Sequence, residues 1–303
     1  MSVRATAIGL AVTLAAAVFA AAGCGQSASG HDHGGVDVVA STDVWGSVAA
    51  AVAGPRISVK SIETGANADP HSFEATPADV AEITDASLLV YNGGGYDHWV
   101  DDVLAGKPEA NAVDAYSLRG TQGQANEHVF YDVGVAKAVA DEIAKRLARI
   151  DSAHAGEYQA NATAFGRRAD DIAAAERAIG QAHPSESVVA TEPVAFYLLR
   201  NAGIADRTPP GFASAVEEGD DPSPADVAAM LDLINSHQVS VLLFNPQTET
   251  AATTQIEDAA RRASLPVVTV TETLPRGVDY LTWQRNTVDE LASQFDKAPQ
   301  TNR

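Results

Sequence analysis

Residues 153–182 read "AHAGEYQANATAFGRRADDIAAAERAIGQA", and this stretch decides how the chain is organised. Its larger apolar residues and matching alanines are spaced by 4, 3, 4, 3 and 7 positions, which puts them on one helical face: Tyr158, Ala162, Phe165, Ala169, Ile172 and Ile179. At 1.5 Å per residue the helix would be about 45 Å long, which is more than one domain needs. Gly180 and Pro184 mark its end. The stretch therefore predicts one long helix that joins two lobes.

Short apolar runs rich in β-branched residues lie on both sides of this helix. Continuous rather than alternating hydrophobicity is typical of strands buried on both faces of a parallel sheet. The runs are 36–40, 57–62, 87–91, 187–190, 239–244 and 266–270. Helical stretches lie between them, one capped by Ser223 before Pro224 and another running from Pro193 to Gly203. The pattern predicts an α/β fold, with two Rossmann-like lobes whose sheets are mainly parallel, joined by a single long connecting helix.

The N-terminal segment is typical of an exported protein. Residues 1–23 combine Arg4 with an apolar run and small residues, the layout of a signal peptide. Cys24, the only cysteine, follows in a position that resembles a bacterial lipobox, where the cysteine becomes lipidated. The alternative is a secreted protein, or one with an uncleaved anchor, whose cysteine position is accidental. No later stretch reaches the roughly 20 apolar residues that span a bilayer, so we expect a lipid anchor on the extracytoplasmic face of the cell membrane.

Residues 24–35 are small and polar and predict a flexible tether. His31 and His33 lie within it, either as ordinary linker residues or as loose metal ligands. The chain as a whole carries a formal net charge of −20. Such a charge repels nucleic-acid phosphates and anionic lipid, which argues against nucleic-acid partners. It also attracts cations, although an acidic surface that serves only solubility is an equal interpretation.

Four polar residues lie in loops that follow predicted strands or precede predicted helices, which is where ligands bind in α/β lobes. His71 lies in the proline-bounded loop "DPHSFEATP", and His128 precedes the helix predicted over 132–150. Glu192 and Glu272 each follow a strand of the second half. Taken singly, each residue is explained by a solvated loop or a helix-capping charge. If the four converge, two imidazoles and two carboxylates form a mixed shell for a divalent first-row metal, held best when the imidazoles are neutral.

The loops that hold these residues resemble a known family. "DPHSFEATPAD", "NEHVFYD", "TEPVAFYLL" and "VTETL" are similar, in the same order, to the ligand loops of the metal-binding lipoproteins of zinc and manganese ABC importers, the cluster A-I solute-binding proteins. Two residues depart from the family's pattern. Glu127 stands where the family usually has proline. Glu272 stands at the position of the family's fourth metal ligand, which is usually aspartate. Asp279, in "GVDYLTW", is therefore an alternative to Glu272.

The resemblance implies that each lobe supplies two of the metal ligands. His71 and His128 would come from an N-terminal lobe of residues 36–152. The carboxylates of Glu192 and Glu272 would come from a C-terminal lobe of residues 183–303. The segment 153–182 would be the rigid connector.

The resemblance also implies the function: a monomeric binding protein that carries one Zn²⁺ or Mn²⁺ ion to an ABC permease and its ATPase, with no catalytic residues. The mixed donor set leaves the choice of metal open. Two rival hypotheses share the ligands. One is an extracellular zinc hydrolase in which Glu272 acts as a general base, and the other is a metal-binding adhesin.

Overall fold

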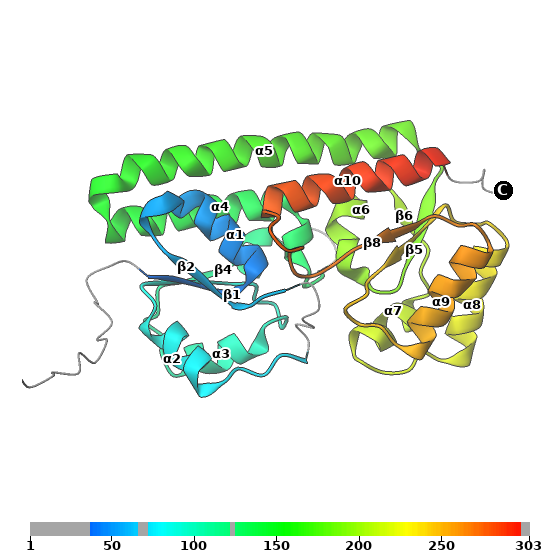
Figure 1. Ribbon diagram of the computed structural model, residues 1–303, viewed down its shortest axis with the longest axis horizontal. Helices are drawn as coiled ribbons and strands as arrows, with labels where there is room; N and C mark the ends of the chain where they lie inside the picture. The colour runs from blue at the N-terminus through cyan, green and yellow to red at the C-terminus, as the bar shows by residue number, and fades with distance from the viewer. Residues whose placement is uncertain (1–36, 66–71, 122–124, 298–303) are drawn as a thin grey trace, which may run out of the picture. The chain divides into compact units, whose positions relative to one another are not determined.

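Two parallel sheets of four strands form the framework of the protein (Figure 1). The structure, a computed structural model, describes residues 37–65, 72–121 and 125–297. The strands are β1 (Val38–Thr42), β2 (Val59–Glu63), β3 (Leu88–Tyr91), β4 (Ala112–Asp114), β5 (Ser187–Ala190), β6 (Ala205–Asp206), β7 (Val241–Phe244) and β8 (Val267–Thr269). Their order is β2-β1-β3-β4 in the first lobe and β6-β5-β7-β8 in the second. The predicted α/β class with two lobes and parallel sheets is confirmed.

Strands β4 and β6 are absent from the sequence prediction, and both lie at a sheet edge. Strand β4 has three residues, and β6 has two, Ala205 and Asp206, which are both exposed. An edge strand pairs on one side only and does not need two buried faces. Neither strand therefore carries the continuous apolar run that marks the central strands.

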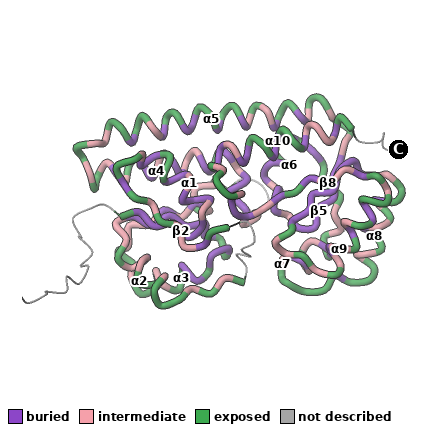
Figure 2. Tube along the Cα trace, viewed as in Figure 1, coloured by how far each residue is buried: buried purple, intermediate pink, exposed green. Residues whose placement is uncertain are grey.

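The central strands bury both faces, as their sequences predict. Val38 and Ala40 of β1 point into a core that continues through both lobes, while Val39 packs on the opposite face. In the second lobe, Leu243 of β7 joins the same shared core and Leu242 joins a separate cluster. The tube in Figure 2 is accordingly purple along β5. Each sheet thus lies between the shared core and a smaller cluster of its own lobe.

Ten α-helices cover the sheets in the described part of the chain. They are α1 (Asp43–Ala53), α2 (Pro77–Asp85), α3 (His98–Ala105), α4 (Val133–Ile150), α5 (Ala155–Ala182), α6 (Phe196–Ala202), α7 (Pro210–Glu217), α8 (Pro224–Asn235), α9 (Ala251–Arg262) and α10 (Tyr280–Lys297). The predicted caps are confirmed: the Ser223 hydroxyl accepts from Asp226 N–H, and Gly203 ends α6 in the left-handed conformation. None of these helices is both long enough and apolar enough to cross a membrane.

Helix α5 runs along both lobes, and its buried face is the predicted one (Figure 1). The stripe also contains an ionisable residue, Glu176, which fills the gap of seven positions between Ile172 and Ile179. Glu176 is 1% exposed and accepts a hydrogen bond from the Asn201 amide of α6. Its Oε1 meets no hydrogen-bond donor among the described residues. Burial raises the pKa of its carboxyl from 4.5 to about 7, with Asn201 opposing and the charge of Asp132 assisting.

This shift predicts a pH-dependent stability. Because the pKa is raised in the folded state, the contribution of Glu176 is complete below about pH 4.5 and is lost as the pH rises through about 7. We expect Glu176→Gln, which keeps an acceptor for Asn201, to match the wild type near pH 5. At pH 8 it should be more stable, by up to about 3 kcal/mol. Urea unfolding at both pH values measures this, with exposed Glu218→Gln as the control. A Glu176→Gln effect that is equal at both pH values would contradict the assignment.

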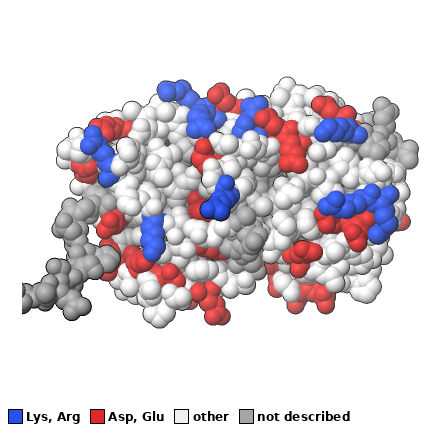
Figure 3. Space-filling model, viewed as in Figure 1, with Lys and Arg blue, Asp and Glu red and all other residues white. Residues whose placement is uncertain are grey.

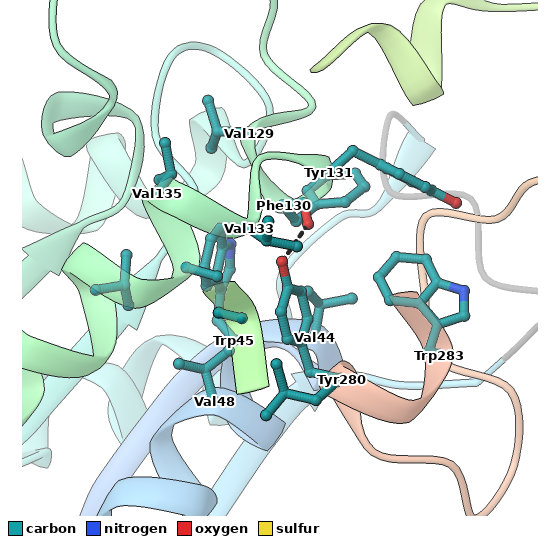
Figure 4. Close-up of a cluster of buried hydrophobic side chains, with 14 of the residues drawn as sticks. Val44, Trp45, Val48, Val129, Phe130, Tyr131, Val133, Val135, Tyr280 and Trp283 are labelled. Carbon is teal, nitrogen blue, oxygen red and sulfur yellow. Dashed lines mark hydrogen bonds between the residues drawn. The ribbon is translucent and has the colours of Figure 1, made fainter. Parts of the chain in front are cut away.

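The C-terminal helix α10 returns to the N-terminal lobe, so α5 is not the only element in contact with both. The Tyr280 hydroxyl donates to the Phe130 carbonyl at 2.7 Å, the dashed line of Figure 4. The Gln284 amide donates to the same carbonyl at 3.1 Å, and Tyr280 N–H donates to the Ser47 hydroxyl at 2.9 Å. The Trp283 ring lies edge-on to Tyr131 with centroids 5.0 Å apart. The chain thus joins the lobes covalently through α5 and packs them together again through α10.

Candidate metal centre

Polar residues gather just past the carboxyl ends of five of the strands. Each lies within three positions of its strand: Asp43 after β1, Asn92 after β3, Glu192 after β5, Asn245 after β7 and Glu272 after β8. All except Asp43 are buried. Parallel strands present their carboxyl ends at one edge of a sheet, where the strand order reverses and a ligand can enter. In both lobes the site is therefore built by the loops that the topology brings together.

His128 is fully buried and directs one defined ring nitrogen toward this site. The Asn126 side-chain oxygen accepts from the His128 backbone N–H at 2.9 Å and meets the ring Nδ1 at 3.0 Å. A backbone N–H can only donate, so the amide atom facing it is the oxygen. The same oxygen must accept from Nδ1–H, which leaves the lone pair of the imidazole on Nε2. Nε2 lies 3.5 Å from Oε2 of Glu272.

Two carboxylates of the second lobe share one amide donor. Asn245 Nδ2 donates to Oε2 of Glu192 at 2.5 Å and to Oε1 of Glu272 at 2.8 Å. Because Asn245 Oδ1 accepts from Gln247 N–H at 3.0 Å, the amide orientation is fixed, with its nitrogen toward the carboxylates. Glu272 N–H in turn donates to Gln247 Oε1 at 2.6 Å. His128, Glu192 and Glu272 are thus brought together from the two lobes.

The electrostatics of this group favour the arrival of a cation. Burial raises the pKa of Glu192, and the charge of Glu272 raises it further. Hydrogen bonds from Thr248 and Asn245 and the neighbouring His128 act in the opposite direction. The Oε1 atom of Glu192 is buried, and no donor among the described residues lies in hydrogen-bond geometry with it. A buried carboxylate oxygen without a donor is costly, and a bound dication would offset that cost.

Aromatic side chains close the site on the N-terminal side. Tyr96 is buried and lies edge-on to His128, with ring centroids 5.8 Å apart. Phe130 meets His128 in the same way at 5.7 Å. Burial, followed by the charge of Glu272, holds the pKa of Tyr96 well above its usual value, so its hydroxyl stays protonated. These rings exclude water around the imidazole.

Asp43 ties together two loops of the site from opposite ends of the chain. One carboxylate oxygen accepts from Gly65 N–H at 3.1 Å and the other from Leu274 N–H at 3.0 Å. The Thr273 hydroxyl also donates to the Gly65 carbonyl at 2.9 Å. The loop after β2 is therefore held against the loop that carries Glu272. Burial raises the pKa of Asp43, and the backbone donors oppose the shift.

Not every predicted site residue can be placed. His71 lies outside the described residues, as do Cys24, His31 and His33. Asp279, the alternative fourth ligand, lies immediately before α10. Its carboxylate accepts one hydrogen bond from the Thr282 N–H at 2.9 Å and one from the Thr282 hydroxyl at 2.8 Å. Its side chain is 56% exposed, and it faces Arg168 across 3.8 Å.

Several residues of the site are absent from the sequence prediction. Asn245 directly follows the run 239–244, so the rule that found Glu192 applies to it equally. Glu127 and Glu217 are a different case: together with His128, each offers one ligand atom within 4.8 Å of the others. Glu217 ends α7 in the second lobe. Glu127 is adjacent to His128 in the chain, but nothing in the local sequence connects Glu217 to His128, so only the folded chain reveals Glu217.

Comparisons with known proteins identify the family and relatives of the chain. The family described as Zinc-uptake complex component A periplasmic matches residues 38–294. The manganese-binding lipoprotein MntA of Halalkalibacterium halodurans is 30% identical over 153 residues, which cover 48% of this chain and 50% of that protein. The chain spans about half the length of the first curated relatives it matches.

Two solved structures share the fold over 86% of this chain. The laminin binding protein Lmb of Streptococcus agalactiae is covered over 100% of its length, with a TM-score of 0.73 and 26% identity. The periplasmic zinc binding protein TroA from Treponema pallidum is covered over 99%, with a TM-score of 0.74 and 16% identity, which shows the fold alone.

Proposed function

Because the chain belongs to the family of periplasmic zinc-uptake component A proteins, we propose that it is an extracytoplasmic solute-binding protein for a divalent metal ion. In this proposal it captures one Zn²⁺ or Mn²⁺ ion between its lobes and delivers it to an ABC permease driven by an ATPase. Relatives of the chain are named as manganese-binding, zinc-uptake and iron-binding proteins, which supports metal cargo in general. The ion is cargo, and the protein acts as a carrier rather than as an enzyme.

The observation that supports the proposal is the convergence of three buried donors from separate elements. Nε2 of His128 lies 3.5 Å from Oε2 of Glu272, and the Asn245 amide links Glu272 to Glu192. We propose that His71 completes the ligand set, because its loop follows β2 in the sequence and Asp43 holds Gly65, which directly follows that strand region, against the loop of Glu272. A shell of two imidazoles and two carboxylates suits either Zn²⁺ or Mn²⁺.

The chain organisation fits this role. We propose that residues 1–23 are a signal peptide, that Cys24 carries the lipid anchor, and that residues 24–35 tether the protein. The lobes are then 36–152 and 183–303, with 153–182 as the connector. A tether of this kind holds a monomeric carrier beside its permease and raises the effective concentration there. On the face shown in Figure 3, acidic and basic side chains are interspersed, without a single basic patch suited to nucleic acid.

Metal titration tests the proposal. We expect protein that begins after residue 23, once stripped with a chelator, to bind one Mn²⁺ or Zn²⁺ ion per chain near neutral pH, with a rise in melting temperature. Calorimetry and elemental analysis measure the stoichiometry. Failure to bind either metal would refute the proposal. Hydrolytic turnover by the zinc-loaded protein, lost in Glu272→Gln, would favour the hydrolase alternative instead.

A further inference from the structure

Helix α6 of the C-terminal lobe contacts the loop that carries His128 in the N-terminal lobe. The Tyr197 hydroxyl donates to the Asn126 carbonyl at 2.7 Å and accepts from Asn126 N–H at 3.2 Å. Three residues further along the helix, Arg200 pairs with the Asp132 carboxylate at 2.9 Å, and its guanidinium lies 4.5 Å from the centre of the Tyr197 ring. We call Tyr197 and Arg200 with Asn126 and Asp132 the α6 contact.

The α6 contact acts on the residue that orients His128. Asn126 is held by the same tyrosine hydroxyl at both its carbonyl and its N–H, so its backbone cannot rotate without breaking two hydrogen bonds. Its side-chain oxygen in turn fixes the His128 ring with the proton on Nδ1 and the lone pair on Nε2. The hydroxyl of one lobe therefore sets the direction of a nitrogen donor in the other.

Helix α6 is itself held in place at both ends, so the α6 contact has a fixed position. It follows Glu192 through a short 3-10 turn, Pro193–Ala195, so the same element carries a carboxylate of the site at its N-terminal end. At its C-terminal end a Cβ on Gly180 of α5 would overlap the Ala202 carbonyl, so α6 and α5 approach as closely as backbones allow. Asn201 also donates to buried Glu176 of α5. Displacement of α6 would therefore disturb Glu192 and His128 together.

We propose that Tyr197 is a positioning residue that couples the two halves of the metal site by holding Asn126 and, through it, His128. The inference rests on the proposed function, since it assumes that His128 and Glu192 bind the same ion. With α6 seated, the donors of both lobes are arranged before the metal arrives.

Burial predicts which of the two side chains, Tyr197 or Arg200, matters more for metal dissociation. Tyr197 is 1% exposed, and loss of its hydroxyl leaves two backbone groups of Asn126 without their partner. The Arg200 side chain is 43% exposed, and exposed ion pairs contribute little to stability. We therefore expect Tyr197→Phe to accelerate metal dissociation about 10-fold, in the range of changes to groups that orient metal ligands. Arg200→Ala should change it by less than about threefold.

The experiment compares Tyr197→Phe with Tyr158→Phe. Tyr158 is also buried, and its hydroxyl makes one hydrogen bond, to Asp151 at 2.7 Å. It lies near the N-terminal end of α5, and neither Tyr158 nor Asp151 is among the site residues. Dissociation of Mn²⁺ or Zn²⁺ into excess chelator gives the rate, and thermal unfolding gives the stability. The proposal requires a faster rate in Tyr197→Phe at a stability similar to that of Tyr158→Phe. Equal rates in the two variants would overturn it.

A second readout needs no metal. In ¹⁵N-histidine-labelled, metal-free protein, the ring nitrogens of His128, assigned by their loss in His128→Ala, should show one tautomer with the proton on Nδ1. We expect Asn126→Ala and Tyr197→Phe to give a mixture of tautomers, and Asn126→Asp, which keeps the acceptor oxygen, to restore the single form. Unchanged shifts in Asn126→Ala and Tyr197→Phe would refute the positioning role even if metal binds. Absence of metal binding in the wild type would refute the proposed function alone.

Discussion

His128→Ala should lower the affinity for Mn²⁺ and Zn²⁺ by at least about 100-fold, because even partners that only orient a metal ligand contribute about 10–100-fold. The substitution removes the one nitrogen donor that the described structure places at the site, Nε2, 3.5 Å from Oε2 of Glu272. It also leaves a cavity in a fully buried position, so some loss of stability accompanies it. Competition with a chelating dye measures the affinity.

A matched control separates coordination from packing and charge. His98 lies at the start of α3 and is exposed, so His98→Ala should leave the affinity within about twofold of the wild type. His128→Gln fills most of the volume without the imidazole and should lose affinity like His128→Ala. If His128→Gln retains wild-type affinity, His128 is not a ligand.

The second large effect concerns the choice between Glu272 and Asp279. We expect Glu272→Ala to weaken metal binding by at least about 100-fold, because this carboxylate is buried beside His128 and shares the Asn245 donor with Glu192. Asp279→Ala should leave the affinity almost unchanged. Its cost should fall on stability, about 1 kcal/mol, because Asp279 caps α10 by accepting from Thr282.

The two variants form a crossed design, with affinity and melting temperature measured on both. Glu272→Ala is expected to lose affinity, and Asp279→Ala is expected to lose stability with affinity retained. The reverse pattern, with Asp279→Ala losing the metal and Glu272→Ala keeping it, would show that the fourth ligand is misassigned. Glu272→Asp, the shorter carboxylate, should bind more weakly than the wild type but better than Glu272→Ala.

The structure also limits how far the lobes can separate. They are joined by one continuous helix, α5, and packed together again by Tyr280 and Gln284 of α10 on the Phe130 carbonyl. The α6 contact adds a third connection beside the site. Metal entry and release should therefore use small movements of the loops around His128 and Glu272, since a wide hinge motion would break buried hydrogen bonds in several places.

The sequence by itself determined the features that depend on local patterns of residues. The period of the 153–182 helix, the apolar runs of the central strands, and the polar residues that follow β5 and β8 are all visible without a structure. Periodicity records which side chains face a core, and strand ends are where α/β lobes bind ligands. The edge strands β4 and β6 were not predicted, because a strand paired on one side needs no continuous apolar run.

Tertiary structure decided what depends on residues far apart in the chain. It placed Glu176 inside the core, set Asn245 between two carboxylates, and put Tyr197 against Asn126, 71 positions earlier. It buried Glu272 beside His128 and left Asp279 half exposed at a helix start, a distinction invisible in "VTETL" and "GVDYLTW". The physical reason is that hydrogen bonds between lobes depend on the register and crossing of whole elements, and local sequence patterns do not record those.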